Sequence, residues 1–312
     1  ASKVTLKDTG DVSVTGYIPV AIIDMNEAPE ITTAKVEFSE NLPVPAKIGK
    51  IAWSDVDTRS SFRDNVVDVL VTAARITVQP DGTVYATSVF DYEAGPRELN
   101  VTVRVYDRTD QSLADTATVK LVLGDIDESP SVRDTVFTVV ENTTGTVGTL
   151  VAKDPEGKGL TYTIVETGTG FAVDAKGKIS NTVPFDYEKE KSKTIHVRVS
   201  DGTLTTVATI RINIADVNEP VHAHDTTFTV DEHTTGHIGK VKAEDEDGTT
   251  VRFHSGDTVH YTVDSVTGDI GLVTPFDYNL TKADTLLVYV TDGEFTDTAK
   301  VIVKVNNVNE AP

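Results

Sequence analysis

The sequence predicts an all-β protein made of tandem Greek-key β-sandwiches, about seven strands each, arranged end to end. Three observations predict this fold class. Two motifs recur along the chain with the same period, the segments between them alternate apolar and polar residues, and short glycine-containing turns separate those segments. Turn signals every 8 to 12 residues between short strands are typical of antiparallel sandwiches.

The first motif is acidic and ends in proline. It reads Asp-Met-Asn-Glu-Ala-Pro, Asp-Ile-Asp-Glu-Ser-Pro, Asp-Val-Asn-Glu-Pro and Asn-Val-Asn-Glu-Ala-Pro, beginning at Asp24, Asp125, Asp216 and Asn307. The second motif, Phe-Asp-Tyr followed by Glu or Asn, begins at Phe90, Phe185 and Phe276. Two independent motifs that share a period of roughly 90 to 100 residues indicate tandem domains. We therefore expect the last hairpin of a preceding repeat at 1–28 and complete repeats at 29–129, 130–219 and 220–312.

The segments between the motifs have the pattern of strands. Residues 194–200 and 208–214 alternate Val, Ile or Ala with polar residues, and no segment has a sustained helical stripe. Turns are predicted at Asp81-Gly82, Lys176-Gly177, Asp201-Gly202, Thr267-Gly268 and Asp292-Gly293. A hairpin alone is marginally stable in water, so residues 1–28 are expected either to pack against the next repeat or to be poorly ordered.

The charge balance favours cations as partners. The 312 residues contain 49 Asp and Glu against 28 Lys and Arg, a net charge of −21. This surplus repels nucleic-acid phosphates and anionic lipids, and with 38% apolar residues no run is long enough to insert into a membrane. The absence of Cys excludes disulfides, thiol catalysis and thiolate metal sites. The chain has no signal-peptide core and stops within a linker motif, so we expect it to be a segment of a longer protein.

Acidic residues recur at the expected strand ends of every repeat. Glu40, Glu141 and Glu232 open the repeats; the pairs Asp55/Asp57, Asp154/Glu156 and Asp245/Asp247 follow, and Asp107, Asp201 and Asp292 each end a late strand. A sandwich gathers its loops at two poles, and carboxylates gathered there repel one another unless a cation joins them. Calcium accepts 6 to 8 hard oxygen ligands, which suits this residue set. A single exposed acid is usually only solvated, but the recurring set predicts calcium.

The acidic motifs of these repeats resemble those of the extracellular repeats of cadherins. The second repeat alone has Glu141-Asn142, Asp154-Pro155-Glu156, Phe185-Asp186-Tyr187-Glu188, Asp201 and Asp216-Val217-Asn218-Glu219-Pro220. The resemblance covers residues 30–312, and five co-spaced motifs make it specific. The sequences of the Phe-Asp-Tyr-Glu and Asn-Glu-Ala-Pro motifs are more similar to those of bacterial or other non-classical cadherin-like proteins than to those of vertebrate adhesion cadherins.

The resemblance implies calcium ligands at each junction of repeats, with up to three ions at a complete junction. The first linker would use Asp24, Asn26, Glu27, Asp55, Asp57 and Asp107, and we expect one ion there because the preceding base is missing. The second would use Glu40, Asp91, Glu93, Asp125, Asp127, Glu128, Asp154, Glu156 and Asp201. The third would use Glu141, Asp186, Glu188, Asp216, Asn218, Glu219, Asp245, Asp247 and Asp292. The last linker, with Glu232, Asp277, Asn309 and Glu310, is expected to be empty or weak.

This chain departs from the family pattern at several ligand positions. Glu27, Glu128 and Glu219 stand where the family usually has Asp, Glu156 replaces the second Asp of Asp-x-Asp, and Asn279 replaces a Glu. Each longer side chain reaches one methylene further and shifts the ligand geometry.

Three other features of the sequence favour different interpretations less strongly. Six of the seven His residues fall between 222 and 260, and on a strand His222 and His224 would share a face; zinc or nickel binding is less favoured than exposed histidines. Trp53 is expected to serve local packing rather than an aromatic ligand platform. Close carboxylate pairs could suggest glycosidase chemistry, but they recur in every repeat, and no catalytic motif is present, so we predict no enzyme.

The resulting prediction is a calcium-rigidified rod within an extracellular or cell-surface adhesion protein. Its expected partners are calcium and a homophilic or heterophilic protein contact, or a polysaccharide. The alternative is a calcium-dependent carbohydrate-binding or accessory module of a secreted polysaccharide-active protein. An aromatic content of only 6% gives that alternative few residues for a sugar platform.

Overall fold

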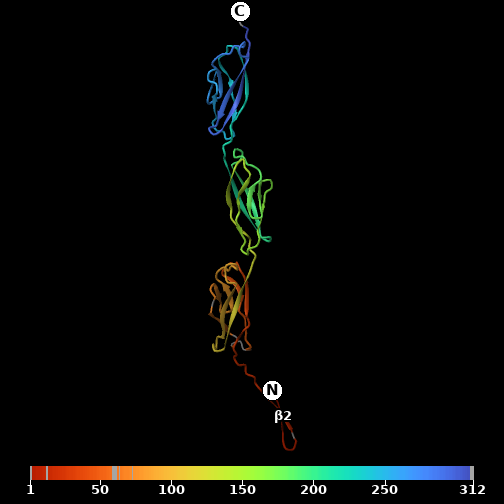
Figure 1. Cartoon of the computed structure of the whole chain (residues 1–312). Coiled ribbons are helices and arrows are strands. Elements are labelled where there is room, and N and C mark those ends of the chain that lie inside the picture. The colour runs from red at the N-terminus through yellow and green to blue at the C-terminus, as the bar shows by residue number, and fades with distance from the viewer. Residues whose placement is uncertain (1, 12, 58–61, 63, 72, 310–312) are drawn as a thin grey trace. The chain divides into compact units, whose positions relative to one another are not determined.

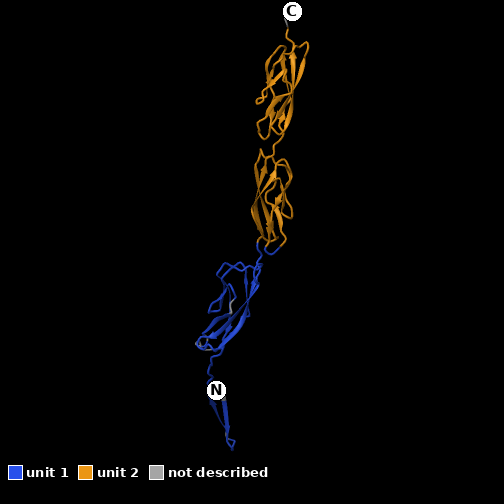
Figure 2. Cartoon of the chain, turned by 60° about the vertical axis from the view of Figure 1, so that its left-hand side comes forward, with its two compact units in different colours: residues 1–128, 155–157 blue, residues 129–154, 158–312 orange. Residues whose placement is uncertain are grey.

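The computed structural model describes residues 2–11, 13–57, 62, 64–71 and 73–309, and these contain strands and no helix. The all-β prediction is therefore confirmed. The chain divides into two compact units, residues 1–128 with 155–157 and residues 129–154 with 158–312 (Figure 2). Within the described ranges, no helix is long and apolar enough to span a membrane.

The first unit begins with an isolated hairpin. Strand β1 (Ser2–Lys7) pairs antiparallel with β2 (Ser13–Ile18), which is labelled in Figure 1. The apolar side chains of Leu6, Val14 and Tyr17 are exposed. Packing of this hairpin against the next repeat, one of the two expected outcomes, is therefore not found, because the described strands of the first sandwich do not cover these side chains.

The rest of the first unit is a sandwich, called here the first sandwich. Its strands are β3 (Glu30–Ile31), β4 (Lys35–Ser39), β5 (Ala46–Lys50), β6 (Trp53–Ser54), β7 (Asn65–Val71), β8 (Ile76–Val78), β9 (Thr83–Ala86), β10 (Glu98–Asp107) and β11 (Ala114–Gly124). One sheet has the order β4-β11-β10-β7 and the other β5-β9-β8, with a short β3-β6 ladder beside them. The chain passes repeatedly from one sheet to the other, which is the predicted Greek-key arrangement.

The second unit contains two sandwiches with the same topology. The second sandwich has strands β12 (Ser131–Val132), β13 (Thr135–Val140), β14 (Gly145–Thr149), β15 (Ala152–Lys153), β16 (Thr161–Ile164), β17 (Phe171–Val173), β18 (Lys178–Asn181), β19 (Ser192–Ser200) and β20 (Thr205–Ala215). The third has β21 (His222–Ala223), β22 (Thr226–Asp231), β23 (Gly236–Lys240), β24 (Ala243–Glu244), β25 (Arg252–Ser255), β26 (Tyr261–Val263), β27 (Asp269–Leu272), β28 (Ala283–Thr291) and β29 (Thr296–Asn306). Their main sheets are β13-β20-β19-β16 with β14-β18-β17, and β22-β29-β28-β25 with β23-β27-β26.

Alternating burial along the long strands builds a separate core in each sandwich. On β20, Ala208, Ile210 and Ile212 are at most 1% exposed, whereas the residues between them face outward. Each such side chain contributes about 1.5–3 kcal/mol when it is fully buried. Trp53 packs against the core of the first sandwich, as the local-packing interpretation predicted.

The predicted turns are present and require glycine. At all five predicted positions the glycine has a positive φ, as at Gly177, where φ is 77°. A Cβ atom on Gly177 would lie 2.6 Å from the carbonyl oxygen of Leu150. Two of these turns contain predicted ligands, because Asp201 and Asp292 come directly after β19 and β28.

Candidate metal centres

A buried glutamate follows the first long strand of each sandwich and ties two distant segments together. Glu141 comes directly after β13 and is 1% exposed. Its Oε2 accepts a hydrogen bond from the backbone N–H of Tyr187 (2.6 Å), and its Oε1 accepts one from the backbone N–H of Val217 (2.8 Å). Tyr187 belongs to the Phe-Asp-Tyr motif and Val217 to the linker, so this carboxylate joins the base of the sandwich to the linker.

The same arrangement occurs in the other two sandwiches. Glu40 accepts hydrogen bonds from the backbone N–H groups of Tyr92 (2.7 Å) and Ile126 (2.8 Å). Glu232 accepts them from the backbone N–H groups of Tyr278 (3.0 Å) and Val308 (2.8 Å). The following residues, Asn41, Asn142 and His233, have φ of 58°, 56° and 60°. Asn adopts this left-handed conformation more readily than most residues. The Glu-Asn motif therefore has a structural role, whether or not its Glu also binds a cation.

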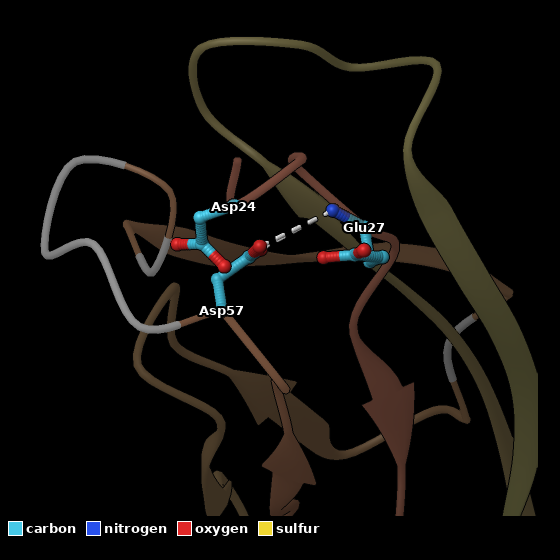
Figure 3. A group of neighbouring side chains, drawn as sticks. All are labelled: Asp24, Glu27 and Asp57. Atoms are coloured by element: carbon cyan, nitrogen blue, oxygen red, sulfur yellow. Dashed lines mark hydrogen bonds between the residues drawn. The ribbon is translucent and has the colours of Figure 1, made fainter. Parts of the chain in front are cut away.

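The first acidic group lies at the first linker, in the first unit. One oxygen each of Asp24, Glu27 and Asp57 lie within 4.8 Å of one another (Figure 3). Asp57 is 2% exposed, and its carboxylate accepts the backbone N–H of Glu27 at 3.3 and 3.4 Å. Asp55 supports the loop, because its Oδ1 accepts the backbone N–H of Asp57 (2.9 Å) and its Oδ2 the side-chain amide of Asn65 (2.6 Å).

Two further groups lie in the first unit and share Glu93. One contains Glu40, Glu93 and Asp125, and the other Glu93, Glu128 and Glu156. The backbone N–H of Glu128 donates to Glu156 Oε1 (3.3 Å), and the side-chain amide of Asn41 donates to Glu128 Oε1. These contacts bring the end of one sandwich, its linker and the 155–157 segment together.

The second unit has two groups that share Glu188. One contains Glu141, Asp186 and Glu188, and the other Glu188, Asp216 and Asp247. The second of these takes one residue from the second sandwich, one from the linker and one from the third sandwich.

The linker of the second unit supports these groups through hydrogen bonds. The backbone N–H of Glu219 donates to Asp247 Oδ2 (2.7 Å), and the Asn218 amide donates to Asp292 Oδ2 (3.0 Å). The Asn142 amide donates to Glu219 Oε1.

Several buried oxygens of the predicted ligands, and one of Asn65, have no hydrogen-bond partner within the described ranges. They are Asn26 Oδ1, Asn65 Oδ1, Asp107 Oδ2, Glu128 Oε2, Asp154 Oδ2, Asp201 Oδ2, Glu219 Oε2 and Asp245 Oδ2. Leaving such atoms unsatisfied is costly, and buried polar groups are normally paired. The donor set consists of carboxylate and amide oxygens, which fits a hard cation such as calcium better than zinc or copper.

The comparisons with known proteins agree with this architecture. A family model described as a bacterial Ig domain matches residues 127–213. The chain is 24% identical over 344 residues to mouse Cadherin EGF LAG seven-pass G-type receptor 1, an alignment that covers 96% of the chain and 11% of that receptor. The structure of mouse Cadherin-23 EC22-24 superposes with a TM-score of 0.62 at 19% identity, covering 90% of this chain and all of that one.

These repeats are cadherin-like. A third similar structure, Protocadherin Gamma B2 extracellular cadherin domains 1-5, has a TM-score of 0.64 at 17% identity, covering 96% of this chain and 64% of that one. The Protocadherin Gamma B2 structure is named for its extracellular cadherin domains, which agrees with the expectation of an extracellular or cell-surface protein. The chain spans only about a tenth of the mouse receptor that it matches. None of these relatives is named for an enzymatic activity.

The close acidic groups found among the described residues contain some of the sequence-predicted acids. The predicted acids outside those groups are Asp55, Asp91, Asp107, Asp127, Asp154, Asp201, Glu219, Asp245 and Asp292. Asp91 also caps a turn, because its Oδ1 accepts the backbone N–H of Ala94 (2.7 Å), as Asp186 does from Lys189 (2.9 Å). Asn65, whose side-chain amide donates to Asp55, was not predicted from the sequence. The sequence feature that could have indicated it is its position at the start of a strand, eight residues after Asp57.

The last linker of the cadherin-like array has a different composition. Among its described residues, Glu232, Asp277 and Asn309 form no group of three close acids, and Glu310 lies outside the described residues.

The rings of His222 and His224 do lie side by side, with centroids 4.7 Å apart. They face different acids, Asp297 at 3.6 Å and Glu244 at 3.5 Å, so they do not converge on one metal position.

Crowding changes the acidity of three carboxyl groups in the cadherin-like linkers. Burial, together with the charges of Glu141 and Asp247, raises the pKa of Glu219 to about 7. The hydrogen bond with Glu156, followed by burial, raises the pKa of Glu128 to about 7. Burial and the contacts with Glu27 and Asp55 raise the pKa of Asp57 to about 6. Near pH 7, Glu128 and Glu219 are therefore partly protonated, and a cation that binds there would displace those protons.

Calcium binding is expected to strengthen as the pH rises from 6 to 8. Calcium binds the ionised carboxylate, so protonation of Glu128 and Glu219 below their raised pKa values competes with the metal. One displaced proton changes the apparent affinity by up to about tenfold per pH unit. Titration calorimetry at pH 7 in buffers of different ionisation enthalpy measures the protons released. Glu219→Gln should reduce that release, and an affinity that stays constant from pH 6 to 8 would contradict the expectation.

Proposed function

We propose that this segment binds calcium at its linkers and that the bound ions stiffen the joints between cadherin-like repeats of an extracellular adhesion protein. The observations that support the proposal are the close acidic groups and the buried oxygens of predicted ligands that have no hydrogen-bond partner among the described residues. Carboxylates this close repel one another, and a divalent cation turns that repulsion into attraction.

The proposed ligands follow the motifs of the chain. The first linker would use the six residues named for it above, and the two later junctions nine residues each, with domain boundaries at 29–129, 130–219 and 220–312. In the second unit, Glu188, Asp216 and Asp247 come from a sandwich base, a linker and the next sandwich. An ion held by all three would restrict movement at that joint.

Calorimetric titration with calcium tests the proposal. Extracellular calcium modules bind at about 0.1–1 mM, and we expect dissociation constants in this range. Asp186→Asn, which alters a group of close acids, should weaken binding measurably. Asp277→Asn is the matched control, because Asp277 holds the same motif position at the last linker. The absence of calcium-dependent heat up to 10 mM would reject the proposal.

We further propose that the segment acts by binding another protein surface, either a second copy or a different partner, and not by catalysis. Sedimentation velocity in calcium and in chelator tests for self-association. Polysaccharide handling receives no support from the relatives, and Trp53 packs against a core instead of forming a platform.

A further inference from the structure

A lysine lies near one buried carboxylate of the second sandwich. The Asp201 side chain is fully buried; its Oδ1 accepts the backbone N–H groups of Thr203 and Leu204, both at 2.6 Å. Its Oδ2 has no hydrogen-bond partner among the described residues and lies 3.8 Å from the Lys158 ammonium nitrogen. The backbone N–H of Lys158 donates to Asp154 Oδ1 (2.9 Å), which fixes the backbone from which this side chain extends.

The third sandwich has the same loop without the positive charge. There the backbone N–H of Thr249 donates to Asp245 Oδ1 (3.1 Å), as Lys158 does to Asp154. Asp292 accepts the backbone N–H groups of Glu294 and Phe295, both at 2.7 Å, through Oδ1. Its Oδ2 accepts the amide of Asn218 instead of facing a lysine (3.0 Å).

The two equivalent aspartates therefore differ in what stabilises their second oxygen. Asp292 Oδ2 accepts an amide hydrogen bond, whereas Asp201 Oδ2 lies 3.8 Å from the Lys158 ammonium group. A buried carboxylate oxygen without a hydrogen-bond donor is stabilised by a nearby positive charge. Lys158 supplies that charge, and its side chain is 37% exposed.

We propose that Lys158 is a built-in counter-ion of the Asp201 carboxylate. It stabilises the second sandwich when calcium is absent, and it competes with calcium for that carboxylate. Asp201 therefore binds calcium more weakly than the equivalent Asp292, so the sites that contain these two residues fill at different calcium concentrations. The inference rests on the proposed calcium function and adds a residue that sets the order of filling.

Reciprocal substitutions in the full chain test this inference. Lys158→Thr, which copies the residue type of Thr249, should tighten the weakest calcium sites about three- to tenfold by calorimetry and lower the melting temperature in excess chelator. Thr249→Lys should weaken calcium binding. Lys158→Arg should behave like the wild type, and Lys158→Met, which keeps the aliphatic stem, should behave like Lys158→Thr if charge is the cause.

The outcomes separate this inference from the proposed function. If the wild type binds calcium and Lys158→Thr binds it with unchanged affinity, the counter-ion role is wrong while the calcium function stands. If the wild type binds no calcium, the proposed function fails and the competition fails with it. In that case, an unchanged melting temperature of Lys158→Met in chelator would also overturn the stabilising role of the charge.

Discussion

We expect calcium at 10 mM to raise the melting temperature of this chain by about 10–20 °C relative to the same protein in excess chelator. A ligand that binds only the folded state stabilises it by about 2.7 kcal/mol per site at a hundred times its dissociation constant, which is reached here for a constant near 0.1 mM. For a domain of about 100 residues, each kcal/mol shifts the melting temperature by about 4–8 °C. Differential scanning calorimetry measures the shift.

Two controls separate bound calcium from general charge screening. Potassium chloride at matched ionic strength screens exposed charges but cannot bridge carboxylates, so it should raise the melting temperature only slightly. Magnesium should be less effective than calcium, because it requires strict octahedral geometry and retains its waters. An equal rise with all three salts would mean that no specific site exists.

We expect Glu141→Ala to destabilise the second sandwich by about 3 kcal/mol or more in calcium and by less in chelator. The substitution leaves the backbone N–H groups of Tyr187 and Val217 without their acceptor, and each unsatisfied buried donor costs about 1–3 kcal/mol. In calcium, the group with Asp186 and Glu188 also loses a ligand. In chelator, removal of one negative charge relieves repulsion and offsets part of the cost.

Glu232→Ala is the matched control for this prediction. Glu232 is 6% exposed and accepts the equivalent bonds from Tyr278 and Val308. It belongs to no close acidic group among the described residues, so its loss should cost about the same with and without calcium. Both variants are measured by denaturant unfolding followed with intrinsic fluorescence and calorimetry. If Glu141→Ala lowered the free energy of unfolding equally in calcium and in chelator, Glu141 would have only a structural role and would not be a calcium ligand.

Much of the fold could be predicted because its causes are local. Alternation of apolar and polar residues along 208–214 is a property of the chain itself, and it correctly predicted a strand with one buried face. Glycine at the turn positions predicted positive φ for the same reason. Whether the N-terminal hairpin packs against the first sandwich was less predictable, because such packing depends on tertiary contacts and not on the hairpin sequence alone.

The candidate site was only partly predictable, because each ligand group forms only where side chains from separate segments of the chain come close together. Asp91 and Asp186 occupy the same motif position and cap the same turn, yet among the described residues only Asp186 lies in a close acidic group, while Asp91 remains exposed. Likewise, the motif alone identified Glu141 as acidic. It could not show that the carboxylate holds the linker through two backbone hydrogen bonds.

By itself, the sequence determined that the chain is all-β, that it repeats, and that oxygen-bearing side chains recur at strand ends, since these depend on residue type and spacing. Only the tertiary structure decided which oxygens are buried, which lack a partner among the described residues, and that Lys158 lies against Asp201. The physical reason is that electrostatic energy depends on distance and on exclusion of water. Both are set when segments some 30 to 80 residues apart pack together.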